Sequence, residues 1–241
     1  LPYRSPCWKI TSGAIALVAL RSDNSIAAWG YNEFGQSDAP GGNDFASIAA
    51  GGYHNLALRQ DGSLTAWGWN NYGQLSVPSG DDFVAIAGGG FHNLALRRDG
   101  SVTAWGSNVY GESDVPIGND FIGIAAGNRF SAALRTDGSL LAWGYDYYGQ
   151  RDVPKGDNFI DISACAEHGL AILNDGSLAR WGFSGYGLSG HPGTGYFSDV
   201  SAGAFHGLAL VGEPAVVPLP GAALLGVLGL GSAGMRLRRR I

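Results

Sequence analysis

Residues 63–68 read Ser-Leu-Thr-Ala-Trp-Gly, and the Trp-Gly pair at the end of this stretch returns at a constant interval of 38 residues. The five tryptophans of these pairs are Trp29, Trp67, Trp105, Trp143 and Trp181. Two further columns with the same interval are Phe45, Phe83, Phe121, Phe159 and Phe197, and Pro40, Pro78, Pro116, Pro154 and Pro192. A fixed period of this length indicates one supersecondary unit that stacks on copies of itself.

Each unit predicts three to four short antiparallel strands. The segments expected in one unit are strands at 44–50, 54–59 and 63–67, an aromatic loop at 69–74 and a short edge piece up to Pro78. Asp61-Gly62 predicts a type I′ hairpin turn between two of the strands. No segment has a helical period long enough for a crossover helix, which argues against α/β repeats. We therefore expect an all-β fold in which the units pack radially as blades of a β-propeller.

The repeat phase divides the chain. The expected boundaries are 1–5 for the end of a preceding truncated repeat, 6–211 for the propeller repeats (6–43, 44–81, 82–119, 120–157, 158–195 and a half repeat 196–211), 212–217 for a linker and 218–241 for a C-terminal segment. Five repeats and a half are present, and closing a ring removes exposed sheet edges, so we expect six or seven blades in the whole protein. The phase of Leu1-Pro2 leads us to expect a missing upstream part that carries a signal peptide.

The charge pattern bears on the kind of partner. The chain of 241 residues has 15% charged and 45% apolar residues, which is typical of a folded protein. Its net charge of −5 combines a basic C-terminus with a part before Pro214 that carries 20 acidic and 11 basic residues, a net charge of −9. A surface of that sign repels phosphate backbones, so we expect no nucleic-acid partner.

The two cysteines, Cys7 and Cys165, fall in different repeat columns. They form no CxxC metal pair and no disulfide framework. Two isolated, buried thiols are the simpler interpretation, and a Cys7–Cys165 bridge is the alternative.

Residues 87–106 read AGGGFHNLALRRDGSVTAWG, which resembles the repeat of the regulator-of-chromosome-condensation family. The pattern Ala-Trp-Gly-x-Asn-x-Tyr-Gly-Gln-x-x-Val-Pro is closer still to bacterial secreted relatives, which include the propeller-type β-lactamase inhibitory protein. The resemblance covers about residues 6–211. It implies a β-propeller, usually of seven blades, and it does not define a function.

The C-terminal segment 218–241 differs from the repeats in its uncharged, apolar composition and its basic end. From Pro218 to Met235 none of the 18 residues is charged, and Arg236, Arg238, Arg239 and Arg240 follow. As a helix this stretch would span about 27 Å, enough to cross a bilayer. The arginines would hold its end in the cytoplasm, which places the propeller outside.

The order Pro218-Leu219-Pro220, apolar span and basic end resembles the PEP-CTERM sorting signal in its Val-Pro-Leu-Pro form. The resemblance implies recognition near Pro218-Leu219-Pro220 by a membrane exosortase and transfer to the bacterial cell surface or extracellular matrix. Leu219 stands where Glu is usual, which leaves the exosortase subtype open. An ordinary C-terminal anchor helix is the alternative.

Recurring polar residues have structural explanations. One column holds His54, His92, His168 and His206, with Phe130 in the remaining slot. Because the same residue returns in successive blades, we expect a structural imidazole bonded to a neighbouring backbone group, not a catalytic base. The Asn/Asp pairs before each Phe, such as Asn43-Asp44, suit turn capping, with calcium binding as the alternative. We expect no metal site, no cofactor and no enzyme activity.

The loop after each Trp-Gly pair holds the candidate binding residues Tyr31, Trp69, Tyr145, Tyr147 and Phe183, which vary between repeats as contact residues do. The constant column Phe34, Tyr72, Tyr110, Tyr148 and Tyr186 is expected to pack under the loop. All these loops should emerge on one face, where exposed aromatics suit protein or glycan recognition. Packing of the variable aromatics against the next blade is the alternative.

These observations predict a non-catalytic extracellular binding or scaffold propeller. Its expected partners are an exosortase during processing, the membrane through the C-terminal helix before processing, and a surface protein or extracellular polysaccharide. An inhibitor of a secreted enzyme is the second hypothesis, by resemblance to the β-lactamase inhibitor. Guanine-nucleotide exchange, the activity of the family's founder, does not suit an exported bacterial chain.

Overall fold

The computed structural model describes residues 9–13, 16–185, 195–202 and 207–211. In these residues all regular structure is β, with 17 strands and no helix. The strands form five three-stranded sheets and one two-stranded sheet, and each sheet contains strands that follow one another in sequence. The predicted all-β fold of repeated meanders is confirmed for this part of the chain.

Each sheet corresponds to one repeat, and we number them as blades. Blade 1 contains β1 (Lys9–Ser12), β2 (Ala16–Leu20) and β3 (Ile26–Gly30); blade 2 contains β4 (Phe45–Ala50), β5 (His54–Arg59) and β6 (Leu64–Gly68). Blade 3 contains β7 (Phe83–Gly88), β8 (His92–Arg97) and β9 (Val102–Gly106); blade 4 contains β10 (Phe121–Ala126), β11 (Phe130–Arg135) and β12 (Leu140–Gly144). Blade 5 contains β13 (Phe159–Cys165), β14 (His168–Leu173) and β15 (Leu178–Gly182), and the last sheet contains β16 (Phe197–Ala202) and β17 (Gly207–Val211).

The second strand of each blade lies in the middle of its sheet. In blade 2, β5 pairs with β4 on one edge and with β6 on the other, both antiparallel. The side chains from His54 to Leu58 are all buried, so both faces of this strand are covered as well as both edges. A strand with two covered faces needs an apolar run instead of alternation, which explains the sequence His-Asn-Leu-Ala-Leu. The predicted edge piece before Pro78 is not a strand, and neither are its counterparts in blades 1, 3 and 4, so these four blades have three strands and not four.

The hairpin between the second and third strands differs from the predicted type I′ turn. Gly62 has a φ of 87°, whereas Asp61 is not among the described residues with positive φ. Gly62 N donates to Arg59 O at 3.1 Å and Arg59 N donates to Ser63 O at 2.9 Å. This is a three-residue loop, in which a type I turn is followed by a left-handed residue. Asp61 contributes through its carboxylate, which accepts hydrogen bonds from the amide and hydroxyl of Ser63.

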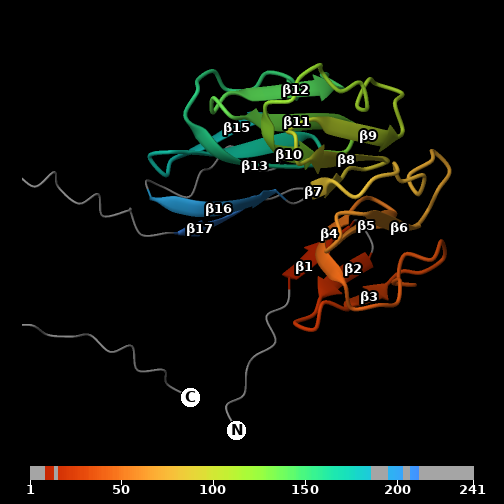
Figure 1. Cartoon of the computed structure of the whole chain (residues 1–241). Helices are drawn as coiled ribbons and strands as arrows, with labels where there is room; N and C mark the ends of the chain where they lie inside the picture. The colour runs from red at the N-terminus through yellow and green to blue at the C-terminus, as the bar shows by residue number, and fades with distance from the viewer. Residues whose placement is uncertain (1–8, 14–15, 186–194, 203–206, 212–241) are drawn as a thin grey trace, which may run out of the picture.

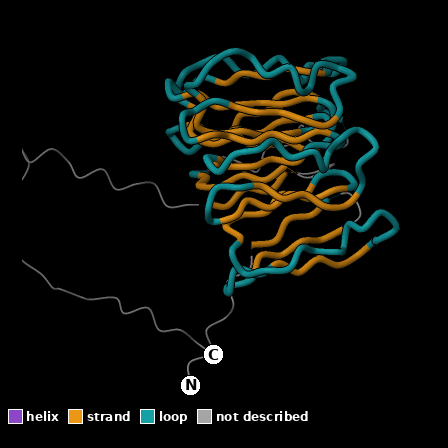
Figure 2. The backbone as a smooth tube through the Cα atoms, turned by 45° about the vertical axis from the view of Figure 1, so that its right-hand side comes forward, coloured by secondary structure: helices purple, strands orange, loops and turns teal. Residues whose placement is uncertain are grey.

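The sheets follow one another in sequence order around an arc (Figure 1), with loops and turns at both ends of the strands (Figure 2). Among the described strands, the closest contacts between neighbouring sheets involve their first and second strands. The turns after the first strands join directly: Gly52 N donates to Gly89 O, and Gly90 N donates to Gly127 O, each at 3.1 Å. A Cβ atom on Gly52 would lie 2.6 Å from Gly90 O, so this approach requires glycine. Sheets that converge at their first strands and spread towards their third strands have propeller-blade geometry.

The hydrophobic core lies between adjacent blades. Between blades 1 and 2 it contains Val18, Leu20, Phe45, Ala57 and Trp67. Equivalent residues build the cores between the later blades. No sheet buries its faces alone, which is why the unit has to be repeated.

Four of the five tryptophans of the Trp-Gly pairs occupy equivalent positions. The indole nitrogens of Trp67, Trp105, Trp143 and Trp181 donate to backbone carbonyls 31 residues earlier, in the loop of the preceding blade, at 2.9–3.0 Å. Trp29 in blade 1 differs, because its side chain is exposed (42%). Four indoles are therefore bonded to the loop of the preceding blade.

Three acids of the Asn/Asp pairs before the Phe strands pair with arginines, whereas the sequence had suggested that these pairs cap turns. Asp44, Asp82 and Asp120 form ion pairs with Arg59, Arg97 and Arg135. Each guanidinium also lies over the Phe that follows the acid, for example 4.6 Å from the ring centroid of Phe45. Where Asn158 replaces the acid, Leu173 replaces the arginine, so both partners change together.

Several sequence-based predictions fall outside the described residues. These are the sorting residues Pro218, Leu219, Pro220, Arg236, Arg238, Arg239 and Arg240, the expected transmembrane helix, His206 and Cys7. Cys165 is half-buried with a free thiol, and burial raises the pKa of that thiol. The blade total and the domain boundaries stay predictions.

Candidate functional site

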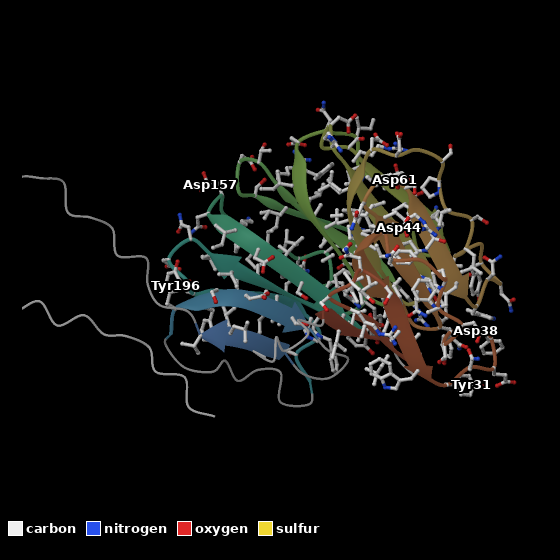
Figure 3. All side chains as sticks on the ribbon, turned by 60° about the horizontal axis from the view of Figure 1, so that its bottom comes forward. Tyr31, Asp38, Asp44, Asp61, Asp157 and Tyr196 are labelled. Atoms are coloured by element: carbon white, nitrogen blue, oxygen red, sulfur yellow. The ribbon has the colours of Figure 1, made fainter. Side chains whose placement is uncertain are left out.

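The loop after the third strand and the turn before the second strand lie at the same end of each blade. The amide of Trp69 donates to the carbonyl of Tyr53 at 2.9 Å, and three later blades repeat this bond. We call this end the loop end, made of loops 31–40, 69–78, 107–116 and 145–154 with turns 51–53, 89–91, 127–129 and 165–167. The other end, with turns such as 60–63, is the hairpin end. In Figure 3, Tyr31 and Asp38 of the loop end of blade 1 lie together, apart from Asp61 at the hairpin end of blade 2.

A buried amide holds each loop in shape. Gln36, Gln74 and Gln150 are almost fully buried, and Glu112 takes this place in blade 3. The side-chain oxygen accepts a bond from the amide two residues earlier, such as Tyr72 N to Gln74 Oε1 at 2.9 Å. Sequence analysis did not single out these residues, although their 38-residue recurrence was a usable signal.

The same residues join each loop to the next blade. The carbonyl of Gln36 accepts the indole Nε1 of Trp67 and the amide Nδ2 of Asn55, both at 2.9 Å. The later blades repeat this arrangement at Gln74 and Glu112. Because each loop is bonded to the following blade, the loop end is a pre-organised surface.

His54 and His92 bond to side chains, whereas the sequence predicted bonds to backbone groups. His54 Nε2 lies 2.6 Å from Asn93 Oδ1, and His92 Nε2 lies 2.8 Å from Ser131 Oγ, in each case in the next blade. Burial lowers the pKa of both imidazoles from 6.5 to about 4, because it disfavours the charged form. His168 is also buried. His54 and His92 therefore contribute neutral imidazoles between blades.

Aromatic residues of blades 1 to 3 form a first cluster at the loop end. Cluster A consists of Tyr31, Phe34, Tyr53, Trp69, Tyr72 and Phe91. The indole of Trp69 is its centre, with ring centroids 5.5 Å from both Tyr72 and Phe91. Most of the contacts are edge-to-face or tilted, which is the favourable geometry for aromatic pairs.

Blades 3 to 5 form a second cluster. Cluster B consists of Tyr110, Tyr145, Tyr147, Tyr148 and Phe183. The guanidinium of Arg129 lies over two of its rings, 5.1 Å from the centroid of Tyr110 and 5.8 Å from that of Tyr145. Burial is the main cause that raises the pKa of the Tyr145 phenol above 10.0, with the Tyr148 phenol adding to it.

The expected division between packing and contact residues is wrong. Phe34, Tyr72, Tyr110 and Tyr148, predicted to pack under the loop, are exposed. The predicted contact residues Trp69, Tyr145 and Phe183 are half-buried, and each packs against at least one neighbouring ring. Tyr31 (42% exposed) and Tyr147 (76% exposed) are open to solvent, as predicted for contact residues.

One column of the loop end was missed altogether. Tyr53, Phe91, Arg129 and Glu167 occupy equivalent positions in the turns of four blades. Tyr53 and Phe91 belong to cluster A, whereas Arg129 lies over cluster B. Glu167 accepts bonds from Asn128 Nδ2 and Gln150 Nε2. The 38-residue interval groups these four positions and was a usable signal.

The two clusters are separated at blade 3. Ser107 takes the place that Trp69 and Tyr145 hold in their own blades. Its hydroxyl donates to the buried carboxylate of Glu112 at 2.6 Å. The aromatic surface therefore consists of two parts with different neighbours.

The described residues were also considered as a metal site and as a membrane span. They contain no group of three or more His, Cys, Asp or Glu that could hold a metal ion. They also contain no helix that is long and apolar enough to cross a membrane.

The comparisons with known proteins bear on the family. Residues 45–74, 83–112 and 121–150 match the family model for the regulator of chromosome condensation (RCC1) repeat. Each matched segment runs from the first strand of a blade to the buried Gln or Glu of its loop. A search of curated proteins found no match.

Solved structures show the same fold. The ectodomain of the receptor kinase CR4 from Physcomitrella patens has a TM-score of 0.72 at 23% identity, over 86% of this chain and 59% of that chain. The CRINKLY WD40 ectodomain of ACR4 from Arabidopsis thaliana has a TM-score of 0.70 at 22% identity, over 87% and 77%. Prp20p from Saccharomyces cerevisiae has a TM-score of 0.71 at 20% identity, over 84% and 69%. These likenesses show the fold alone, and together with the matched repeats they support a repeat protein with RCC1-type repeats and a β-propeller fold.

Proposed function

We propose that this protein is a non-catalytic extracellular binding or scaffold propeller whose partner, a surface protein or extracellular polysaccharide, docks on the loop end. The observation that carries the proposal is the set of exposed rings there, Tyr31, Phe34, Tyr72, Tyr110, Tyr147 and Tyr148. Large exposed aromatics on a rigid support are typical of recognition surfaces. Prp20p, with a similar fold, is described with binding to Gsp1p and histones, which supports a protein-binding role for the architecture.

Site-specific photo-crosslinking tests the docking surface. A photoreactive phenylalanine analogue replaces Tyr72 or Tyr147 at the loop end, and Ile117 serves as the matched control. Ile117 is a fully exposed apolar residue outside both clusters. We expect an envelope component to crosslink from the two loop-end positions and unlabelled wild-type protein to compete it away. Equal crosslinking from Ile117, or no competition, would overturn the proposal.

The export part of the proposal rests on the C-terminal segment 218–241 alone. We propose that an exosortase recognises Pro218-Leu219-Pro220 and that the propeller reaches the cell surface or extracellular matrix. Replacing both prolines with Ala should leave the unprocessed chain in the inner membrane, whereas wild-type protein appears outside without its arginines. Identical fractionation of both proteins, read by mass spectrometry of the C-terminus, would contradict sorting. No observation on the described residues favours the enzyme-inhibitor hypothesis, and the expected lack of enzyme activity stays a prediction.

A further inference from the structure

We infer that the loop end binds a cationic protein segment that places arginine side chains against the rings of clusters A and B. The inference rests on the proposed function and names the chemistry of the partner. It excludes an acidic polysaccharide, nucleic acid or a second copy of this chain as the occupant of the surface.

The chain itself shows a guanidinium on this aromatic surface. Arg129 lies over Tyr110 and Tyr145. One and two repeats earlier, Phe91 and Tyr53 occupy the position of Arg129 and contact the rings of cluster A. A flat cation and an aromatic ring are therefore interchangeable against these loops. Guanidinium groups stack on aromatic faces through cation–π attraction. An arginine from a partner can therefore bind these rings in the way that Arg129 does.

The charge of the loop end favours a cation. Its loops and turns, as far as the structure describes them, carry six carboxylates that are exposed or half-buried: Glu33, Asp38, Asp114, Asp146, Asp152 and Glu167. Against them stand two guanidinium groups, those of Arg129 and Arg151. Arg129 is already engaged with cluster B. A negative rim attracts a cationic partner and repels both anionic polymers and a second copy of the same face.

Tyr147 is the most accessible ring of the surface. It is 76% exposed, and its neighbours Asp146 and Tyr148 are exposed as well. Its ring lies nearly parallel to Tyr145 at 6.4 Å and edge-on to Tyr148 at 4.9 Å. The ring is therefore held in place while most of its surface meets solvent. An arginine at this point would contact an aromatic face and lie beside a carboxylate.

The experiment titrates the full chain with fluorescein-labelled nonapeptides of arginine, lysine or glutamate and measures anisotropy. We expect the arginine peptide to bind more tightly than the lysine peptide of equal charge, and the glutamate peptide not to bind. Tyr147→Ala and Tyr72→Ala should each weaken arginine binding by about threefold, since each removes a ring without a change of charge. Ile117→Ala is the control and should leave affinity unchanged.

Three results would overturn the inference: no arginine binding, equal affinity for arginine and lysine, or no effect of the tyrosine variants. An attraction due to net charge alone would give the last two results. The photo-crosslinking experiment is independent of these outcomes. If loop-end crosslinks persist while the arginine peptide fails to bind, the proposal of a docking surface at the loop end is supported and the inference of a cationic partner is wrong.

Discussion

The imidazole Nε2 of His54 lies 2.6 Å from Oδ1 of Asn93, and both side chains are buried between blades 2 and 3. The next blade repeats the contact with His92 and Ser131. Phe130 replaces the histidine in blade 4 and Gly169 stands at the facing position, whereas the position equivalent to the facing residue of His168 is Gly207. The contacts of His54 and His92 join blade 2 to blade 3 and blade 3 to blade 4.

The buried imidazole of His54 makes the free energy of unfolding dependent on pH. The folded-state pKa of His54 is about 4, below 6.5, because burial disfavours the imidazolium. The unfolded chain therefore binds more protons between these values, and stability falls as pH drops through this window. We expect a loss of about 2 kcal/mol per such histidine between pH 7 and 5, measured by urea unfolding.

The variant His54→Phe/Asn93→Gly copies the Phe130–Gly169 pair and is the control. It should lose less stability between the two pH values than wild type, whatever its stability at pH 7. An unchanged pH dependence would contradict a buried, neutral His54.

A second prediction concerns the shared carbonyl of Gln36. In the variant Trp67→Phe the carbonyl still accepts a hydrogen bond from Asn55, and in the variant Asn55→Ala it still accepts one from the indole of Trp67. The double variant buries an acceptor with neither donor, which costs about 1–3 kcal/mol. We expect its loss in unfolding free energy to exceed the sum of the single losses by about 1 kcal/mol. Additive losses would show that the carbonyl finds another donor.

A third prediction compares two glycines. Gly62 has a φ of 87°, and a Cβ atom there would lie 2.0 Å from the carbonyl oxygen of Asp81, at the end of the same repeat. Gly62→Ala should therefore destabilise the protein by more than about 1 kcal/mol. Gly41→Ala is the matched control, because a Cβ at Gly41 would meet nothing within 4 Å. Thermal unfolding of both variants distinguishes a required glycine from a tolerated one.

A fourth prediction concerns Asp82 and Arg97 at the hairpin end. Arg97→Leu removes an ion pair and a guanidinium 4.2 Å from the ring centroid of Phe83. Since the pair is partly exposed, we expect a loss of about 1–2 kcal/mol. Adding Asp82→Asn, as in the Asn158–Leu173 pair, should cost little more. A large additional loss would mean that Asp82 has a role apart from the arginine.

The repeat period predicted most of the fold. The 38-residue interval placed every strand of blade 2 to within one residue, because a blade must bury both faces against its neighbours. The type I′ turn at Asp61-Gly62 was wrong, since the Asp-Gly pair is also compatible with a type I turn followed by a left-handed glycine. Two residues alone do not define the number of residues in a loop.

The candidate site was predicted less well. The aromatic loops were recognised, but exposure was inferred from variation between repeats, and Trp69 is variable and yet half-buried. Its burial depends on Phe34 of the preceding blade and Phe91 of the following one, contacts that no single repeat contains. The Gln36 column was missed because its role depends on a carbonyl facing the next blade.

Hydrogen–deuterium exchange of the full chain, with and without saturating arginine nonapeptide, tests the central claim most directly. The account predicts slower exchange confined to the loop end, in segments 69–74, 107–112 and 145–150. Protection confined to the hairpin end, around residues 60–63, 98–101 and 136–139, would contradict it, as would no protection at either end.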